Sequence, residues 1–360
     1  MWGGQMIWLK QMPKLTKAAP INRLLIIGLG SIGRRHLAFA RKLLPEATIA
    51  VLRHKTGSDI PEYADYIFYT MAEALAFAPQ VAVIANPATF HISSAMPLAD
   101  AGIHTLIEKP ISTTTDGVVE LLNSFNRTNT VLTIGYNLRF LSSLQKFKSM
   151  LDEKKIGEIW SVHSEIGQYL PNWRPDSDYR QSVSARYALG GGVLLELSHE
   201  LDYLRWIFGE VKWVQAVLAR QSDLEVDVED SAYLTLGFAA RNSARSLIAT
   251  ANLDFIRQDT TRSCTAVGKL GSLRWNGIEG TVEFWAPDQQ GWQEVYKHQS
   301  TRDESYVAQW QHFIDCVERE TKPLITGTDG LKVLQIVEAV RLAAKTGNQT
   351  QVVNVNAPGD

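Results

Sequence analysis

The chain has 360 residues, more than one hydrophobic core usually organises, so two domains are expected. With 45% hydrophobic and 21% charged residues, its composition is that of an ordinary soluble globular protein. A formal net charge of -2 at pH 7 gives no general attraction to nucleic acid or to an anionic membrane. Neither is therefore expected as a partner, and any anion-binding site must be local.

The cysteines and the N-terminal residues predict neither a metal centre nor export. Cys264 and Cys316 lack the spacing of a zinc site or of a Cys-x-x-Cys redox motif, and no metal is expected. Residues 1–20 contain no uninterrupted apolar core of a signal peptide and are expected to form a loose extension. No later segment approaches the roughly 20 apolar residues that cross a bilayer. We therefore expect a cytoplasmic protein.

Residues 21–137 alternate short apolar strands with helical stretches, which predicts a dinucleotide-binding Rossmann domain of the α/β class. Hydrophobic periodicity places helices at 34–44, 71–78, 92–101 and 117–125. The expected strands are 24–28, 48–52, 66–69, 81–85, 105–108 and 131–135. Right-handed crossovers between them give a doubly wound parallel sheet.

Residues 138–360 have a different pattern, which predicts an α+β domain for substrate binding and oligomerisation. Alternating strands indicate a large, mainly antiparallel sheet, with strands at 158–166, 211–219, 232–238, 246–253 and 281–285. Helices are expected at 190–208, 306–320 and 328–346. The last of them could pack back on the first domain.

A strong dinucleotide signal stands at the start of the first domain. The first strand runs into Gly28, Gly30 and Gly33, a G-x-G-x-x-G motif that opens a helix. Gly28 permits the tight turn, Gly30 lets the backbone approach a pyrophosphate, and Gly33 allows close helix–strand packing. Cofactor contacts are therefore expected along the whole turn, at Gly28, Leu29, Gly30, Ser31, Ile32 and Gly33. The alternative is a glycine-rich turn that binds nothing.

The end of the second strand determines which ribose is accepted. An NAD-selective fold places Asp or Glu about 20 residues beyond the glycines, but this chain has Arg53 followed by His54. Cationic donors suit a 2'-phosphate, so NADP is preferred as cofactor over NAD. A solvated strand end is the alternative interpretation.

Two further strand ends carry polar residues. Asn86, Pro87 and His91 follow the fourth strand, and Glu108 and Lys109 precede a proline after the fifth. Carboxyl ends of the strands in an open α/β sheet face the cofactor crevice, so Lys109 is expected to project toward the nicotinamide. Taken alone, a lysine before a proline is also an ordinary loop residue.

These motifs, with the segments 135–140 and 190–202, resemble the glucose-fructose oxidoreductase, inositol dehydrogenase and MocA (Gfo/Idh/MocA) family over nearly the whole chain. The resemblance implies an NAD(P)-dependent oxidoreductase that transfers a hydride between nicotinamide and a sugar or sugar derivative. It also implies that Lys109 is catalytic, that the bond before Pro110 is often cis, and that the open face of the second sheet forms a homodimer or homotetramer.

The family's second catalytic element is a histidine on the helix after the glycine run, with an aspartate four residues before it and another acid three after. His199 and Asp202 match this pattern, but Leu195 stands at the first position. Glu196, three residues before His199, would share a helix face with it. Glu196, Asp202 and Tyr136 are therefore candidates for catalytic support. Outside the family context, a lone histidine is more often a packing residue.

Residues 168–187 are rich in aromatic and basic side chains. Trp173 and Tyr179 could stack on a sugar or base, and Arg174 and Arg180 could pair with a carboxylate or phosphate. With Arg139, they are the expected substrate contacts. We expect an acidic or nucleotide-linked sugar of surface polysaccharide biosynthesis; an ordinary long loop is the alternative.

Three other functions fit the same sequence. One is an enzyme with no net redox change that retains its cofactor, and another is a non-catalytic, nicotinamide-sensing regulatory protein. The third is a structural module that assembles through its antiparallel sheet. The presence of both Lys109 and His199 argues against the sensor.

Overall fold

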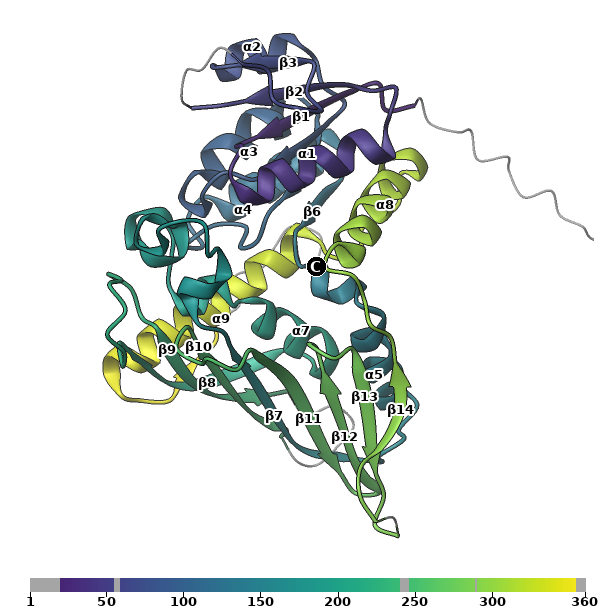
Figure 1. The fold of residues 1–360 in the computed structure, drawn as a ribbon, viewed down its shortest axis with the longest axis vertical. Coiled ribbons are helices and arrows are strands. Elements are labelled where there is room, and N and C mark those ends of the chain that lie inside the picture. The colour runs from purple at the N-terminus through teal and green to yellow at the C-terminus, as the bar shows by residue number, and fades with distance from the viewer. Residues whose placement is uncertain (1–19, 55–58, 240–245, 289, 354–360) are drawn as a thin grey trace, which may run out of the picture.

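The computed structural model describes residues 20–54, 59–239, 246–288 and 290–353, so the predicted extension lies almost entirely outside the described residues. Two β-sheets, each covered by helices, organise the chain (Figure 1). The first sheet is built from the purple and blue N-terminal third and the second mainly from the teal and green middle.

The first sheet has six strands, all parallel, in the order β3-β2-β1-β4-β5-β6. This order confirms the predicted doubly wound sheet, because the chain reverses direction across the sheet between β1 and β4. The strands are β1 (Arg23–Ile27), β2 (Thr48–Leu52), β3 (Tyr66–Phe68), β4 (Val81–Ile84), β5 (His104–Ile107) and β6 (Leu132–Ile134).

Alternating side chains of the strands fill a core on each face of this sheet. Leu25 and Ile27 belong to one buried cluster, and Leu24 and Ile26 to the other, as the two-residue period of a strand requires. The helices of this part of the chain are α1 (Ser31–Leu43), α2 (Met71–Ala76), α3 (His91–Asp100) and α4 (Val118–Thr128), with the short 3-10 helix η1 (Ala88–Phe90).

The second sheet has nine strands in the order β14-β13-β12-β11-β7-β10-β9-β8-β15. Only the β7–β10 pair is parallel within the described sheet, so the predicted mainly antiparallel character is confirmed. The strands are β7 (Ile159–Gly167), β8 (Val211–Ala219), β9 (Ser231–Phe238), β10 (Ile248–Asp254), β11 (Thr261–Gly268), β12 (Gly271–Asn276), β13 (Thr281–Trp285), β14 (Gln293–Lys297) and β15 (Thr350–Gln351).

The remaining helices connect and cover the two sheets. They are η2 (Asn137–Phe140), α5 (Ser142–Asp152), η3 (Leu170–Trp173), η4 (Tyr179–Gln181), η5 (Val183–Ala185), η6 (Tyr187–Leu189), α6 (Val193–Glu196), α7 (His199–Phe208), α8 (Glu304–Arg319) and α9 (Gly327–Thr346). Helix α8 packs on α1 of the first sheet, while α9 contacts β8 and also reaches α4 and β6 (Figure 1). Helices α8 and α9 therefore connect the two parts of the structure.

Candidate functional site

The glycine turn between β1 and α1 leaves room for an anion. Gly28 has a φ of +91°, and a Cβ there would lie 2.7 Å from the backbone nitrogen of Asn86. A Cβ on Gly33 would lie 2.2 Å from the carbonyl oxygen of Gly28, so this glycine permits helix–strand packing, as predicted. Gly30, by contrast, faces open space and begins α1 without a side-chain cap or an acidic residue in the first turn. The free N–H groups of this helix end suit a pyrophosphate.

A cleft of about 870 Å³ opens at this turn, along the carboxyl ends of the parallel strands. Most of the residues predicted to contact the cofactor line it, namely Gly28, Leu29, Gly30, Ser31, Ile32, Arg53, His54, Asn86, Pro87, His91, Glu108 and Lys109. The Oδ1 atom of Asn86 is buried there without a hydrogen-bond partner, while its Nδ2 donates to Ser94 Oγ at 2.9 Å. An orphaned polar atom beside an uncapped helix end fits the polar groups of a dinucleotide.

Basic side chains surround this part of the cleft. Arg53 and His54 line it at the end of β2, and Arg35 and Arg302 line it from α1 and from the residues before α8. The Arg35 guanidinium lies 5.1 Å from the ring centroid of Tyr306, which also lines the cleft. The local positive charge that the near-neutral chain requires for binding an anion is therefore present in the cleft.

Lys109 lies in the wall of the cleft, held at both ends. Its Nζ donates to the backbone carbonyl of Glu196 at 2.8 Å, and its backbone N–H donates to Glu108 Oε2 at 3.1 Å. The Lys109–Pro110 peptide bond is cis, as the resemblance implied. The buried ring of His91 lies 2.9 Å from the carbonyls of both Asn86 and Pro110, and so ties the fourth strand end to the fifth.

The helix predicted at 190–208 is in fact two helices. α6 ends at Glu196, α7 begins at His199, and Leu197 between them has a non-helical ψ of 22°. This break leaves the Glu196 carbonyl free to accept the Lys109 ammonium. The expectation that Glu196 and His199 share a helix face was therefore wrong, because no continuous helix connects them.

His199 is partly buried and does not line the cleft, although the Glu196 side chain does. Its Nδ1 is buried without a hydrogen-bond partner. Burial lowers the pKa of His199 well below its usual 6.5, and the positive charges of Lys109 and Arg262 lower it further. At neutral pH the imidazole is therefore uncharged and has a free lone pair.

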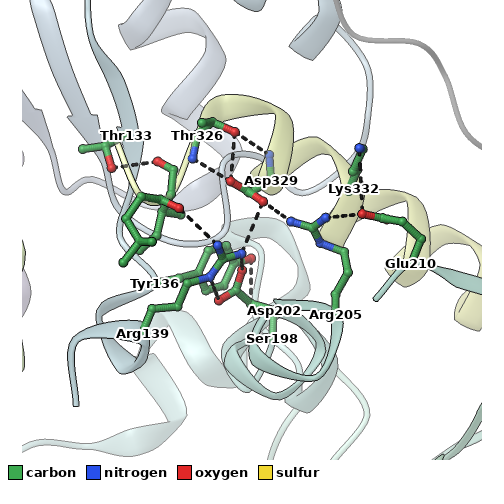
Figure 2. A network of polar contacts seen from close by, with 12 residues as sticks. Thr133, Tyr136, Arg139, Ser198, Asp202, Arg205, Glu210, Thr326, Asp329 and Lys332 are labelled. Carbon is green, nitrogen blue, oxygen red and sulfur yellow. Dashed lines mark hydrogen bonds and ion pairs between the residues drawn. The ribbon is translucent and has the colours of Figure 1, made fainter. Parts of the chain in front are cut away.

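Asp202 and Arg139 lie in a buried ion-pair network rather than at the cleft (Figure 2). Arg139 donates to Asp202 through Nε at 2.9 Å and Nη2 at 2.6 Å, and both side chains are at most 2% exposed. Asp329 at the start of α9 extends the network to Arg205 on α7. The structure does not support the expected substrate contact at Arg139 or the expected catalytic support at Asp202. Each of these charged side chains is already paired with the other inside the protein.

Tyr136 is also outside the cleft. It is fully buried, its hydroxyl donates to Ser198 Oγ at 3.4 Å, and its ring meets His199 edge-on. Burial raises the pKa of Tyr136 far above its usual value, so the phenol stays protonated. Its position indicates a packing role beside His199 rather than proton transfer.

The segment 168–187 is divided between the cleft and the surface. Trp173 and Arg174 line the cleft, as do Gln168 and Ser182. Arg180 instead pairs with Asp178 and Glu225, and the Tyr179 hydroxyl accepts from the Glu225 backbone N–H. Tyr179 and Arg180 are therefore removed from the expected set of substrate contacts.

Sequence reasoning missed several lining residues. Arg35 stands directly after the glycine motif, where a basic residue on the first helical turns could have been noticed. Arg302 and Tyr306 come from the far end of the chain and carry no local signal. Among the residues that the structure describes, no cluster of His, Cys or carboxylates suits a metal, and no helix could span a membrane.

Both parts of the chain match one family of known proteins. Residues 22–136 match the NAD-binding Rossmann fold of an oxidoreductase family, and residues 148–354 match the C-terminal alpha/beta domain of the same family. A myo-inositol 2-dehydrogenase of Thermotoga maritima is 24% identical over 89% of this chain and 95% of its own length. An uncharacterized oxidoreductase of Bacillus subtilis, YrbE, is 26% identical over 89% and 94%.

Solved structures share the fold. A levoglucosan dehydrogenase in complex with NADH superposes with a TM-score of 0.80 at 20% identity, covering 93% of this chain and 100% of that one. The WlbA dehydrogenase of Bordetella pertussis, in complex with NADH and UDP-GlcNAcA, has a TM-score of 0.76 at 20% identity over 94% and 100%. With family matches to both sheets, the resemblance is confirmed: the chain belongs to the Gfo/Idh/MocA oxidoreductase family.

Proposed function

We propose that the protein is an NAD(P)-dependent oxidoreductase that acts on a CH–OH group of a sugar or sugar derivative. The observation that carries the proposal is Lys109, whose ammonium lies in the wall of a cleft that begins at an uncapped helix end. Relatives named as sugar and inositol dehydrogenases support the reaction class. The bound nicotinamide supplies the hydride acceptor or donor, and the protein binds, orients and manages the proton.

Lys109 is the group best placed to act on the substrate oxygen. An ammonium in a partly buried cleft stabilises negative charge that develops on a carbinol oxygen as its proton leaves. Its present acceptor, the Glu196 carbonyl, also fixes its direction. His199, which is uncharged at neutral pH and close enough to Lys109 to feel its charge, is the proposed acceptor of that proton, although its side chain does not line the cleft.

NADP is the proposed cofactor in preference to NAD. Arg53 and His54 line the cleft at the end of β2. Guanidinium and imidazole groups can donate hydrogen bonds to a 2'-phosphate, whereas neither is the carboxylate that accepts bonds from a free 2'-hydroxyl. Structural neighbours bound to NADH or NAD show that the fold also accepts the non-phosphorylated cofactor.

The proposed substrate is an acidic or nucleotide-linked sugar of surface polysaccharide biosynthesis. Trp173 offers an aromatic face in the cleft, held by an indole N–H bond to the Gln168 carbonyl at 3.1 Å. Arg174 is exposed beside it and can pair with a carboxylate or phosphate in forked geometry. A structural neighbour in complex with NADH and UDP-GlcNAcA supports this substrate class. A homodimer or homotetramer formed through the open face of the nine-stranded sheet is part of the same proposal.

A pair of arginine variants tests the substrate class. Arg174→Ala should raise the KM for an acidic or nucleotide sugar about tenfold or more, while cofactor affinity holds, because one forked ion pair is lost. Arg180→Ala is the matched control, since its guanidinium pairs with Asp178 and Glu225 outside the cleft. Equal KM values for both variants, or better turnover of uncharged monosaccharides, would contradict this substrate class.

A further inference from the structure

A buried chain of hydrogen bonds leads from helix α8 to the cleft. Trp310 Nε1 donates to His36 Nδ1 at 2.8 Å, and His36 Nε2 lies 2.7 Å from Glu108 Oε1. Glu108 Oε2 accepts the backbone N–H of Lys109 at 3.1 Å. Trp310 and His36 are fully buried, and Glu108 is 6% exposed where it lines the cleft. The proposed reaction does not use these hydrogen bonds.

The donor at its start determines where the proton on His36 lies. An indole N–H can only donate, so His36 Nδ1 must accept and carries no proton. The ring proton therefore stands on Nε2 and is donated to Glu108. A second proton on Nδ1 would bring two N–H groups face to face at 2.8 Å. The His36–Glu108 pair thus carries one negative charge, on the carboxylate.

The surroundings fix this carboxylate in place beside Lys109. Burial disfavours the ionised form of Glu108, whereas the hydrogen bond from His36, the charge of Lys109 and the Lys109 backbone N–H all favour it. A Cβ on Gly135 would lie 3.0 Å from Glu108 Oε2, so the missing side chain makes room for the carboxylate. Glu108 is therefore an ionised carboxylate, held in one orientation, that offsets the charge of the Lys109 ammonium.

We propose that Trp310 and His36 are positioning residues that hold Glu108 as a fixed negative charge in the cleft, and that this charge favours the oxidised cofactor over the reduced one. The inference rests on the proposed cofactor site. The oxidised nicotinamide ring is cationic and the reduced ring is neutral. Without Glu108, the Lys109 ammonium would repel the cationic ring, whereas the neutral ring would be little affected.

Cofactor titrations of the full chain test this charge directly. Dissociation constants for oxidised and reduced cofactor, measured by fluorescence at one ionic strength, give a ratio for each variant. Glu108→Gln keeps the shape and, through its amide oxygen, an acceptor for His36, but it removes the charge and the acceptor for the Lys109 N–H. It should weaken oxidised cofactor about tenfold while reduced cofactor changes less than about twofold.

Trp310→Phe tests the positioning residue independently. Without the indole donor, nothing holds His36 Nδ1 as an acceptor, and the ring is free to turn away from Glu108. The oxidised cofactor should then bind several times more weakly relative to the reduced form, in the same direction as in Glu108→Gln. The groups that face His36 are Glu108 from the β5 end and Tyr306 and Trp310 from α8, with the charges of Lys109 and Arg35 next to them.

The control is a second buried indole. Trp275 in β12 is fully buried, and its Nε1 donates to Ser143 Oγ at 3.0 Å, away from the cleft lining. Trp275→Phe should leave the ratio of the two dissociation constants unchanged. Both variants lose a buried indole, so a loss of stability that they share is distinguished from a change in the ratio of the two dissociation constants.

The outcomes distinguish this inference from the proposed function. Failure of the wild type to bind either cofactor form would overturn both. Normal binding, with the same ratio in wild type, Glu108→Gln and Trp310→Phe, would overturn the fixed-charge inference alone. A parallel loss of both affinities would assign the chain of hydrogen bonds to packing. If Glu108→Gln does not fold, the ratio of the two dissociation constants in Trp310→Phe decides.

Discussion

Replacing Asp202 by alanine should destabilise the protein severely although the residue lies outside the cleft. Asp202 accepts two charge-assisted hydrogen bonds from Arg139, at 2.9 and 2.6 Å, and both side chains are at most 2% exposed (Figure 2). Its removal leaves a buried guanidinium without its main partner, which typically costs about 3–5 kcal/mol.

For Asp202→Ala, the structure indicates a loss of unfolding free energy near the lower end of that range. Asp329 lies 3.4 Å from Arg139 and stays as a partial counter-charge, but it is shared with Arg205. We therefore expect about 3 kcal/mol for Asp202→Ala. Asp152→Ala is the control, because that carboxylate is 56% exposed in its ion pair with Lys148 and should cost less than about 1 kcal/mol.

Urea unfolding, followed by tryptophan fluorescence and by circular dichroism, measures the difference. Coincident transitions are needed because a chain of this size can unfold in more than one step. The double variant Arg139→Met/Asp202→Leu should recover most of the lost stability, since the unpaired charge is gone. A loss in Asp202→Ala no larger than in Asp152→Ala would refute the reasoning.

Four further outcomes are expected. Lys109→Met should lower turnover about a hundredfold while the cofactor still binds, the oxidised form no more weakly than in wild type because a nearby positive charge is removed; stopped-flow kinetics with unchanged turnover would remove it from the mechanism. Arg53→Asp should reverse the NADP preference in competitive titrations, and a wild type that binds NAD more tightly would show the assignment to be wrong. Because the pKa of His199 lies well below 6.5, its neutral form persists, and kcat/KM should not fall with a midpoint near 6.5 as the pH is lowered. Burial acts to raise the pKa of Asp230, but hydrogen bonds from the backbone of Gln221 and from Ser222 outweigh it and hold the pKa below 3.8. The stabilisation by the ionised carboxylate is therefore present above pH 3.8 and is lost as the pH falls through the pKa of the folded state. Acid unfolding should be shallower in Asp230→Asn.

Local pattern was sufficient for the parallel sheet and the cofactor turn. A buried strand is a run of apolar residues, and a close backbone approach requires glycine, so both features can be predicted from the sequence. β1, β2 and β4 lie within a residue or two of the predicted bounds. β11 was missed because its alternation is weak, whereas β12, also missed, does alternate buried Leu273 and Trp275 with polar residues but is short. In β11 only Cys264, Ala266 and Gly268 are buried, and small residues give little hydrophobic contrast.

Tertiary contacts decided what local pattern could not. The helical period runs through Leu197, yet the helix breaks there, and the freed Glu196 carbonyl meets a lysine 87 positions earlier in the chain. Likewise, the composition of 168–187 could not separate Arg174, which reaches the cleft, from Arg180, whose partners lie on another loop. Arg139 resembled a ligand contact only because its buried partner, Asp202, is distant in sequence.

Turnover of sugars by wild type and by Lys109→Met tests the central claim most directly. Neutral sugars, sugar acids and nucleotide sugars are each mixed with NADP or NAD, and absorbance at the reduced-nicotinamide band is followed. The proposed function predicts a sugar-dependent rise with wild type that Lys109→Met loses although it still binds the cofactor. Cofactor binding without such a rise on any sugar, in wild type and variant alike, would contradict the enzyme and favour a nicotinamide-sensing protein.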